Sequence, residues 1–260
     1  MGVAAAIIAG IRGRTMKIRL LKPLLIVGVL LMIWQMVATL GSFPHYIFPS
    51  PQAVGQQLFT HAELLWQHTQ VTLLEICLGL LLGFLFGLIS ALLLSFSRQI
   101  STVLLPILVI SQAIPVFAIA PLLVLWFGYG MASKIVMSVL IIYFPVTAAC
   151  YDGLRNTPQA WLDLAKTFNI SPLRLLLKVR LPAALPAFAS GLRIAVSVAP
   201  IGAVVGEWVG SSEGLGYLMI HANARMQVDL MFAALLILVS ISLCLYFSID
   251  RLLHRFIWSV

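Results

Sequence analysis

Long apolar runs recur along this chain, and they constrain its fold more than any other feature. A helix needs roughly 20 apolar residues to cross a bilayer. Of the 260 residues, 62% are hydrophobic and 9% are charged, whereas soluble domains carry about 25% charged residues. We therefore predict an all-α polytopic membrane protein with about six transmembrane helices, over residues 23–40, 71–96, 103–127, 135–150, 183–206 and 230–248.

The basic residues are distributed unevenly between the two sides of this arrangement. The formal net charge is +8, and when both termini are placed inside, only Lys134 and Arg225 fall outside. The positive-inside rule expects this asymmetry. The sequence thus predicts cytoplasmic termini, with a cytoplasmic segment over residues 1–22, a transmembrane domain over residues 23–260 and a cytoplasmic loop over residues 152–182.

Residues 157–182, TPQAWLDLAKTFNISPLRLLLKVRLP, form a long segment that is neither an apolar run nor a short connection. Thr157 is a candidate cap for a helix whose first residue is Pro158. Asn169 suits the left-handed conformation that ends helices. The spacing i, i+4 and i+7 predicts one apolar face for this helix, made by Trp161, Ala165 and Phe168.

A second start signal follows at Ser171 and Pro172. Beyond it, Arg174 and Lys178 lie four residues apart and give the next helix a basic side. We predict two short helices joined by a tight turn and closed by the Leu181-Pro182 pair.

Two of the apolar runs carry a small residue at every fourth position. Such a stripe lets another helix approach closely. The predicted contact surfaces are Gly79, Gly83, Gly87 and Ala91 in the second run, and Gly191, Ala195, Ala199 and Ala203 in the fifth.

The sequence lacks the familiar signatures of catalysis and cofactor binding. It contains no G-x-x-x-x-G-K-[ST] loop to hold ATP phosphates, no H-E-x-x-H and no G-x-S-x-G. Its three cysteines lie in or beside apolar runs without a C-x-x-C pair, so we predict plain thiols. We therefore predict neither an enzyme nor a metal or cofactor site.

Acidic residues near the apolar runs are few. Glu75 lies near the outer end of the second run and Glu207 just beyond the fifth. A charge buried at membrane depth costs about 3 kcal/mol, so Glu75 is expected to face water, a partner or a solute pathway. A secondary transporter would usually carry acidic residues within the membrane for proton or sodium coupling, whereas both of these acids lie near the outer boundary. A channel would need a filter or a charged ring, and the sequence shows neither. The basic helix pair is tied between two spans, so no nucleic-acid partner is predicted.

The loop resembles one found in a known family. Permease subunits of binding-protein-dependent ABC importers carry a cytoplasmic pattern E-A-A-x3-G-x9-I-x-L-P. The residues at these spacings are Asp163, Leu164, Ala165, Asn169, Val179, Leu181 and Pro182. Leu164 and Asn169 depart from the pattern, although Asn tolerates the left-handed turn better than other non-glycine residues.

The resemblance extends over nearly the whole chain. The runs QAIPVFAIAPLLVLWFGYG and GEWVGSSEGLGY look like the nitrate/sulfonate/taurine group of importer permeases. The run FPVTAACYDGLRNTP is most similar to the branch for hydroxymethylpyrimidine-type thiamine precursors. Nitrate, sulfonate or taurine import and ATP-independent secondary transport are the alternatives.

The resemblance implies the type I importer-permease fold in a bacterial inner membrane, surrounded by lipid. In that family two permease subunits pair, here as a homodimer, and an extracytoplasmic substrate-binding protein delivers the solute. Two ABC ATPase subunits bind ATP and Mg, so no cofactor is expected in this chain. The implied ATPase-coupling residues are Asp163, Ala165, Asn169, Ser171, Arg174, Lys178, Leu181 and Pro182.

Candidates for the solute pathway are aromatic, polar or acidic: Gln112, Trp126, Tyr143, Glu207 and Trp208. These side chains suit a flat neutral or weakly basic ring better than a small anion. Arg193, towards the inner end of its run, is the one cationic candidate, and it is expected either to reach the interface or to face the pathway. Each pathway candidate could instead pack between helices or lie at the membrane interface.

Overall fold

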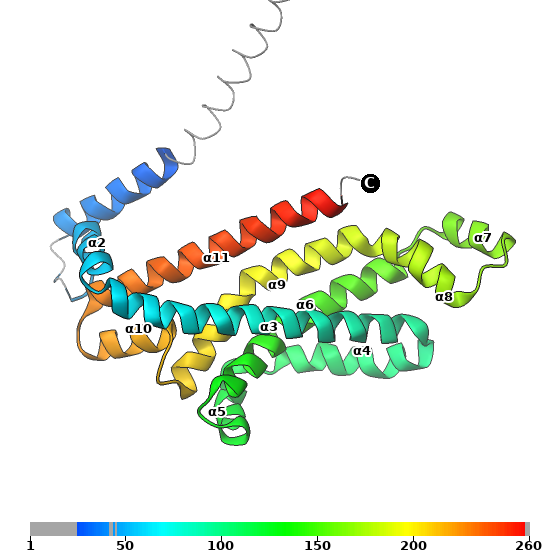
Figure 1. The fold of residues 1–260 in the computed structure, drawn as a ribbon, viewed down its shortest axis with the longest axis horizontal. Helices are drawn as coiled ribbons and strands as arrows, with labels where there is room; N and C mark the ends of the chain where they lie inside the picture. Colours follow the sequence, from blue (N-terminus) through cyan, green and yellow to red (C-terminus); the bar gives the residue numbers. More distant parts are fainter. Residues whose placement is uncertain (1–24, 42–43, 45, 258–260) are drawn as a thin grey trace, which may run out of the picture. The chain divides into compact units, whose positions relative to one another are not determined.

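The computed structural model describes residues 25–41, 44 and 46–257, and every regular element in this part of the chain is helical (Figure 1). The predicted segment 1–22 lies outside the described residues. The helices are Leu25–Leu40, α2 Pro51–Thr60, α3 Ala62–Phe96, α4 Arg98–Ala113, α5 Val116–Phe127, α6 Met131–Arg155, α7 Gln159–Thr167, α8 Pro172–Leu175, the π-helical turn η1 Leu176–Arg180, α9 Leu181–Gly210, α10 Leu215–Ala224 and α11 Val228–Ile257.

The chain divides into two compact units. The first comprises the described residues up to His61 together with Ala222–Ala233, and the second comprises Ala62–His221 together with the chain from Ala234 onward. In the first unit, three aromatic rings pack together, with centroids 6.0–6.4 Å apart: Trp34, Phe48 and Phe232. The Trp34 indole Nε1 also donates a hydrogen bond to the Pro49 carbonyl at 3.0 Å.

Five of the six predicted apolar runs each lie in one helix over their described residues, and the third run, 103–127, is divided between α4 and α5. Four helices of the described chain are long and apolar enough to cross a membrane: α3, α6, the continuous stretch Pro172–Gly210, and Val228–Arg255. The helix Leu25–Leu40 is apolar but shorter. The fold class predicted from the sequence is therefore confirmed.

The third predicted run, residues 103–127, is not one straight span. It breaks into α4 and α5, which are bent by 99° relative to each other (Figure 1). Pro115 is the cause, because a proline has no N–H and pushes the residue before it out of the helical region. Ile114 accordingly has extended dihedrals, φ −83° and ψ 114°. Pro115 then stands at the N-cap of α5.

The helix that precedes the second predicted run is α2, which begins at Pro51. It ends at Thr60, and His61 leaves the helical conformation with φ −113° and ψ 27°. α3 begins immediately afterwards at Ala62 and continues for 35 residues to Phe96, so this helix starts before the predicted residue 71.

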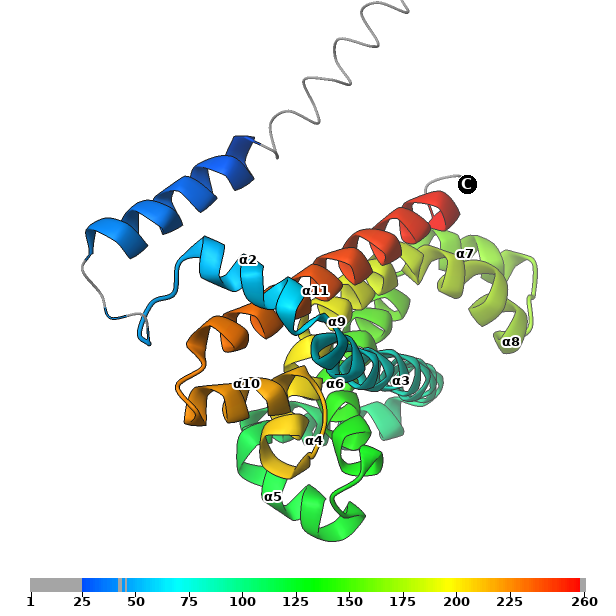
Figure 2. The same cartoon turned by 60° about the vertical axis from the view of Figure 1, so that its left-hand side comes forward.

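The second unit is built around α6, which packs against α3 and α9 (Figures 1 and 2). The two predicted small-residue stripes make these contacts. A Cβ atom on Gly83 would lie 2.6 Å from Ile142 Cγ2, and one on Gly87 would lie 2.8 Å from Val146 Cγ1. Side chains larger than hydrogen cannot fit there, so the small residues set the helix separation.

The stripe on α9 also approaches α6 closely. Gly191 faces Ala149 and the Pro145 carbonyl of α6. The alanines of this stripe lie in one fully buried cluster, Ile76, Ile142, Val146, Ala195, Ala199 and Ala203. Both predictions of close helix packing are confirmed.

Candidate functional site

The predicted coupling loop lies between α6 and α9 and holds α7, α8 and η1. Its first helix begins one residue later than predicted, at Gln159, with Pro158 at the N-cap and no side-chain capping bond. Thr157 is not a cap. Its buried hydroxyl instead donates to the Leu154 carbonyl at 3.0 Å, because that carbonyl, at the end of α6, has lost its helical partner.

The turn between α7 and α8 has the predicted left-handed residue. Asn169 has φ +50°. Its N–H donates to the Lys166 carbonyl at 2.9 Å, and the Ile170 N–H donates to the Ala165 carbonyl at 3.4 Å. These two bonds form a Schellman motif, which satisfies the last carbonyls of a helix. The prediction for Asn169 is confirmed.

The second helix of the loop does not stop at Leu181 and Pro182, contrary to the prediction. The stretch Pro172–Gly210 is continuous over 39 residues. Pro182 cannot donate an N–H and its ring would clash with a carbonyl of the preceding turn. The π-helical turn η1 widens the helix just before Pro182, with the Leu181 N–H bonded to the Leu176 carbonyl, and this accommodates the proline.

The loop presents an exposed apolar groove. Trp161 is 52% exposed and Phe168 is 71% exposed, on the face predicted from their spacing, while Ala165 lies buried beneath them. The groove has a volume of about 370 Å³ and is lined by Trp161, Leu164, Ala165, Phe168, Ile170, Lys178, Val179 and Pro182. An exposed apolar surface of this kind is typical of an interaction site.

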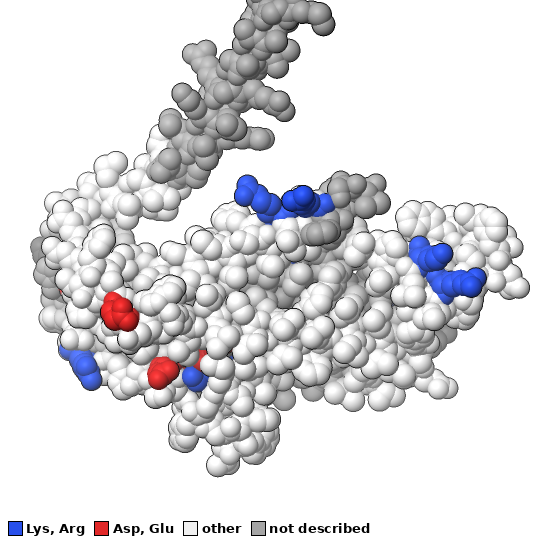
Figure 3. Space-filling view, viewed as in Figure 1, with Lys and Arg blue, Asp and Glu red and all other residues white. Residues whose placement is uncertain are grey.

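The elements that form this groove also carry charged side chains, of which Lys178 lines the groove itself. On α7, Asp163 accepts hydrogen bonds from Lys166 Nζ at 2.8 Å and from Gln159 Nε2 at 3.0 Å. These two bonds hold the pKa of Asp163 below its usual range, and the bond from Lys166 has the larger effect. Arg174 and Lys178 are exposed, as is Ser171 at the N-cap of α8. Figure 3 shows Lys and Arg gathered at this end of the unit, while much of the visible face is uncharged.

The five pathway candidates do not share one cavity. Glu207 and Trp208 line a cavity of about 110 Å³ on α9, and the Trp208 ring lies 5.8 Å from that of Phe117. Tyr143 donates to Ser90 Oγ of α3 at 2.8 Å. Gln112, at the end of α4, and Trp126, on α5, are exposed. Their assignment to a solute pathway stays a prediction.

A buried polar cluster between α3, α6 and α9 was not predicted from the sequence. Lys134 Nζ on α6 lies 2.8 Å from Glu75 Oε1 on α3, and the two side chains are 7% and 0% exposed. Glu75 is therefore buried rather than at an interface, and Lys134 is not on the outer surface. The sequence did show two opposite charges near the ends of neighbouring spans, which could have indicated an ion pair. It did not show the register between the two helices, which decides whether the charges meet.

Glu207 completes this cluster from α9. Its carboxylate accepts a hydrogen bond from Thr72 Oγ1 of α3 at 2.5 Å and another from the Gly216 N–H at the start of α10. Thr72 Oγ1 in turn accepts from the Leu215 N–H at 2.8 Å. The cluster thus satisfies the first N–H groups of α10, a helix that the sequence analysis did not predict.

Arg193 on α9 forms an ion pair with α11. Its Nε lies 2.6 Å from Asp250 Oδ1, and both side chains are about a quarter exposed. Whether it reaches the interface or faces a pathway stays a prediction.

Comparison with known proteins agrees with this architecture. The family model described as binding-protein-dependent transport system inner membrane component matches residues 83–258. The inward-facing methionine ABC transporter MetNI has a similar chain, with a TM-score of 0.66 and 20% identity over 76% of this chain and 98% of that one. At this identity, the likeness shows the type I importer-permease fold alone.

Relatives of higher identity cover nearly the whole chain. A probable ABC transporter permease protein of Haemophilus influenzae is 99% identical over 245 residues, 94% of this chain and 100% of that protein. The formylaminopyrimidine transport permease protein ThiX of Halalkalibacterium halodurans is 37% identical over 89% of this chain and 93% of its own length. The taurine transport system permease protein TauC of Escherichia coli is 32% identical over 88% and 86%. The chain therefore belongs to the family of binding-protein-dependent ABC transporter permeases, the multi-pass inner-membrane components of these systems.

Proposed function

We propose that this permease couples to ATPase subunits through residues 157–182 and forms the solute pathway of an ATP-driven importer. The exposed apolar groove on α7 and η1 supports this proposal most directly. Trp161 and Phe168 supply aromatic anchors of the type that dominate binding interfaces. Arg174 and Lys178 add a basic side that suits acidic neighbours on a partner.

The continuous helix Pro172–Gly210 explains how docking could move the membrane domain. At 1.5 Å per residue, its 39 residues extend over about 58 Å. Its first turns line the docking groove, and its last turns carry Glu207 and Trp208. A displacement of the loop by an ATPase would therefore act on both ends of one rigid element.

The proposed assembly contains two copies of this chain, two ATPases that bind ATP and Mg, and an extracytoplasmic substrate-binding protein. In this proposal both termini and the α7–α8 loop are cytoplasmic, which the distribution of basic residues in the sequence supports. In this arrangement the ATPases perform the hydrolysis, since the sequence has no phosphate-binding loop of its own.

For the solute, we propose a pyrimidine precursor of thiamine. The 37% identity to a formylaminopyrimidine permease supports this choice. Aromatic candidates such as Trp126, Tyr143 and Trp208 can stack on a flat ring. Arg193, the one cationic candidate for binding a small anion, is paired with Asp250. The similarity to a taurine permease keeps sulfonate import as the second candidate.

Uptake measurements distinguish these possibilities. Cells that express the permease with its ATPase and binding protein should accumulate a labelled aminopyrimidine, and unlabelled aminopyrimidine should compete whereas taurine and nitrate should not. The opposite competition pattern would assign the system to anion import. Uptake by the permease alone, driven by an ion gradient, would contradict the ATP-driven mechanism.

A pair of variants tests the docking groove separately. Phe168→Ala removes an exposed anchor from α7, so it should reduce ATPase association and uptake together. Phe59→Ala is the matched control, because Phe59 is 85% exposed on α2 and lies outside the groove. Equal ATPase association of the two variants in a pull-down from detergent would count against docking at this surface.

A further inference from the structure

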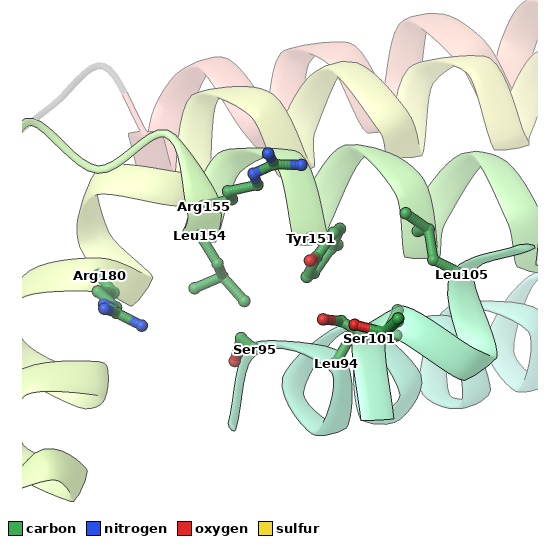
Figure 4. A pocket seen from close by; sticks show the side chains of 9 residues that line it. Leu94, Ser95, Ser101, Leu105, Tyr151, Leu154, Arg155 and Arg180 are labelled. Atoms are coloured by element: carbon green, nitrogen blue, oxygen red, sulfur yellow. The ribbon is translucent and has the colours of Figure 1, made fainter. Parts of the chain in front are cut away.

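A second cavity, of about 570 Å³, lies where α3, α4, α6 and η1 meet beside the coupling loop (Figure 4). Two guanidinium groups line it, Arg155 from α6 and Arg180 from η1. In Figure 4, Arg180 extends into the gap between the helices and Arg155 lies along one rim. Hydroxyl groups complete the polar lining: Ser95, Ser101, Thr102 and Tyr151.

The charge of this cavity is unbalanced. None of its lining residues is acidic. The Nε atom of Arg180 is buried and has no hydrogen-bond partner among the described residues. A buried donor without an acceptor costs about 1–3 kcal/mol, and more when the group is charged. A phosphate group is the anion whose oxygens match two guanidiniums in one cavity.

An apolar groove continues from the basic cavity. This groove has a volume of about 180 Å³ and shares Leu94, Leu105 and Tyr151 with the cavity. It extends along α4 and α6 past Leu108 and Phe144 towards the middle of the apolar runs, and Asp152 is its one charged lining residue. A basic cavity that opens into an apolar groove matches an amphiphile with an anionic head and a hydrocarbon tail.

We propose that the cavity binds the phosphate headgroup of an anionic phospholipid, with an acyl chain in the groove between α4 and α6. The lipid comes from the leaflet on the side of the coupling loop. Arg180 lies in η1, directly before α9, so the bound phosphate connects the coupling loop to the ends of α3 and α4. A soluble phosphate could satisfy the same guanidiniums but would leave the apolar groove empty.

Binding can be measured on the full chain in neutral detergent by native mass spectrometry, with phosphatidylglycerol and phosphatidylcholine as probes. We expect one phosphatidylglycerol per chain, retained against a phosphatidylcholine excess. Replacing both arginines, Arg155→Gln with Arg180→Gln, should weaken retention about 30-fold, since each basic residue near an anionic lipid contributes about a factor of 5. Arg251→Gln is the matched control, because Arg251 is exposed on α11 and does not line the cavity.

A second pair of variants tests the groove without changing charge. Leu105→Trp fills the junction between cavity and groove and should reduce phosphatidylglycerol retention, while Val103→Trp, at an exposed position of α4, should not. All variants must elute as single species in size-exclusion chromatography.

Three results would overturn the proposal. Equal loss of lipid retention in Arg251→Gln and in the double variant Arg155→Gln with Arg180→Gln would indicate general surface attraction. Displacement of the lipid by inorganic phosphate at equal concentration would identify a soluble ligand. Unchanged phosphatidylglycerol retention in Leu105→Trp would show that the acyl chain does not occupy the groove. None of these readouts depends on solute uptake, so they are independent of the function proposed above.

Discussion

The buried ion pair between Glu75 and Lys134 allows a quantitative test of how burial determines the energy of a charge interaction. A second pair in the same chain, Asp163 with Lys166 on α7, has the same N–O distance of 2.8 Å. Its side chains are 58% and 71% exposed, whereas those of the first pair are 0% and 7% exposed. Distance is therefore matched and burial differs.

The expected energies follow from this difference. Lys134→Met removes the ammonium and leaves the buried Glu75 carboxylate beside Glu207 without its positive partner, which costs about 3–5 kcal/mol. The second oxygen of that carboxylate, Oε2, is buried and has no hydrogen-bond partner among the described residues. Lys166→Met breaks a solvated pair, and water screens such pairs so strongly that they contribute little to stability.

Thermal unfolding in detergent converts these energies into measurable shifts. At about 2–4 °C per kcal/mol for a chain of this size, Lys134→Met should lower the melting temperature by about 6–20 °C, whereas Lys166→Met should change it little. The double variant Glu75→Leu with Lys134→Met should melt near the unmodified protein, because it removes both charges. Equal melting of the two single variants, or a double variant no better than Lys134→Met, would refute the reasoning.

Three further outcomes are expected. Gly83→Ala should destabilise the protein by about 1–3 kcal/mol because the new Cβ has no room beside α6. Gly55→Ala, in open space on α2, should instead stabilise the protein by up to about 1 kcal/mol. Melting curves of the two variants measure this difference. Asn169→Val should strain the left-handed turn by about 1–2 kcal/mol and reduce uptake, and Asn169→Gly should retain uptake. Because the pKa of Asp163 is lowered, its carboxylate stays charged and bonded to Lys166 at neutral pH. The contribution of this bond to stability is lost only as the pH falls through that lowered pKa. The ratio of uptake by Asp163→Asn to that of the unmodified protein should therefore stay constant between about pH 5 and pH 8.

Local chemistry explains which parts of this structure could be predicted from sequence. The contacts of Gly83 and Gly87 follow from a four-residue period on one helix face, and the left-handed turn follows from Asn169 alone. The break at Pro115 was not predicted, although three prolines were visible in that run, because a proline inside an apolar run can either kink a helix or end it. Its neighbours in space decide between these outcomes.

Features that depend on the register between helices could not be predicted. Glu75 and Lys134 are 59 residues apart in the chain, and each alone suggested an interfacial position. Their pairing requires α3 and α6 to pack in one particular register. The contact between Gly83 and α6 sets this register in the folded structure, and the sequence does not show which residues of α6 it involves. The continuity of Pro172–Gly210 was missed for a related reason, since a proline was read as the end of a helix and the widened turn η1 compensates for it.

The packing of α6 also restricts how this permease can change conformation. α6 leads into the coupling loop and α9 leads out of it, so an ATPase that displaces the loop acts on both helices together. Their contacts at Gly191 and Gly202 leave no space for a Cβ atom, and sliding by one residue would place a larger side chain at each of these points. The same holds between α3 and α6 at Gly83. We therefore infer that α3, α6 and α9 move as one rigid body, and that the conformational change occurs at the break between α4 and α5 and at contacts outside this block.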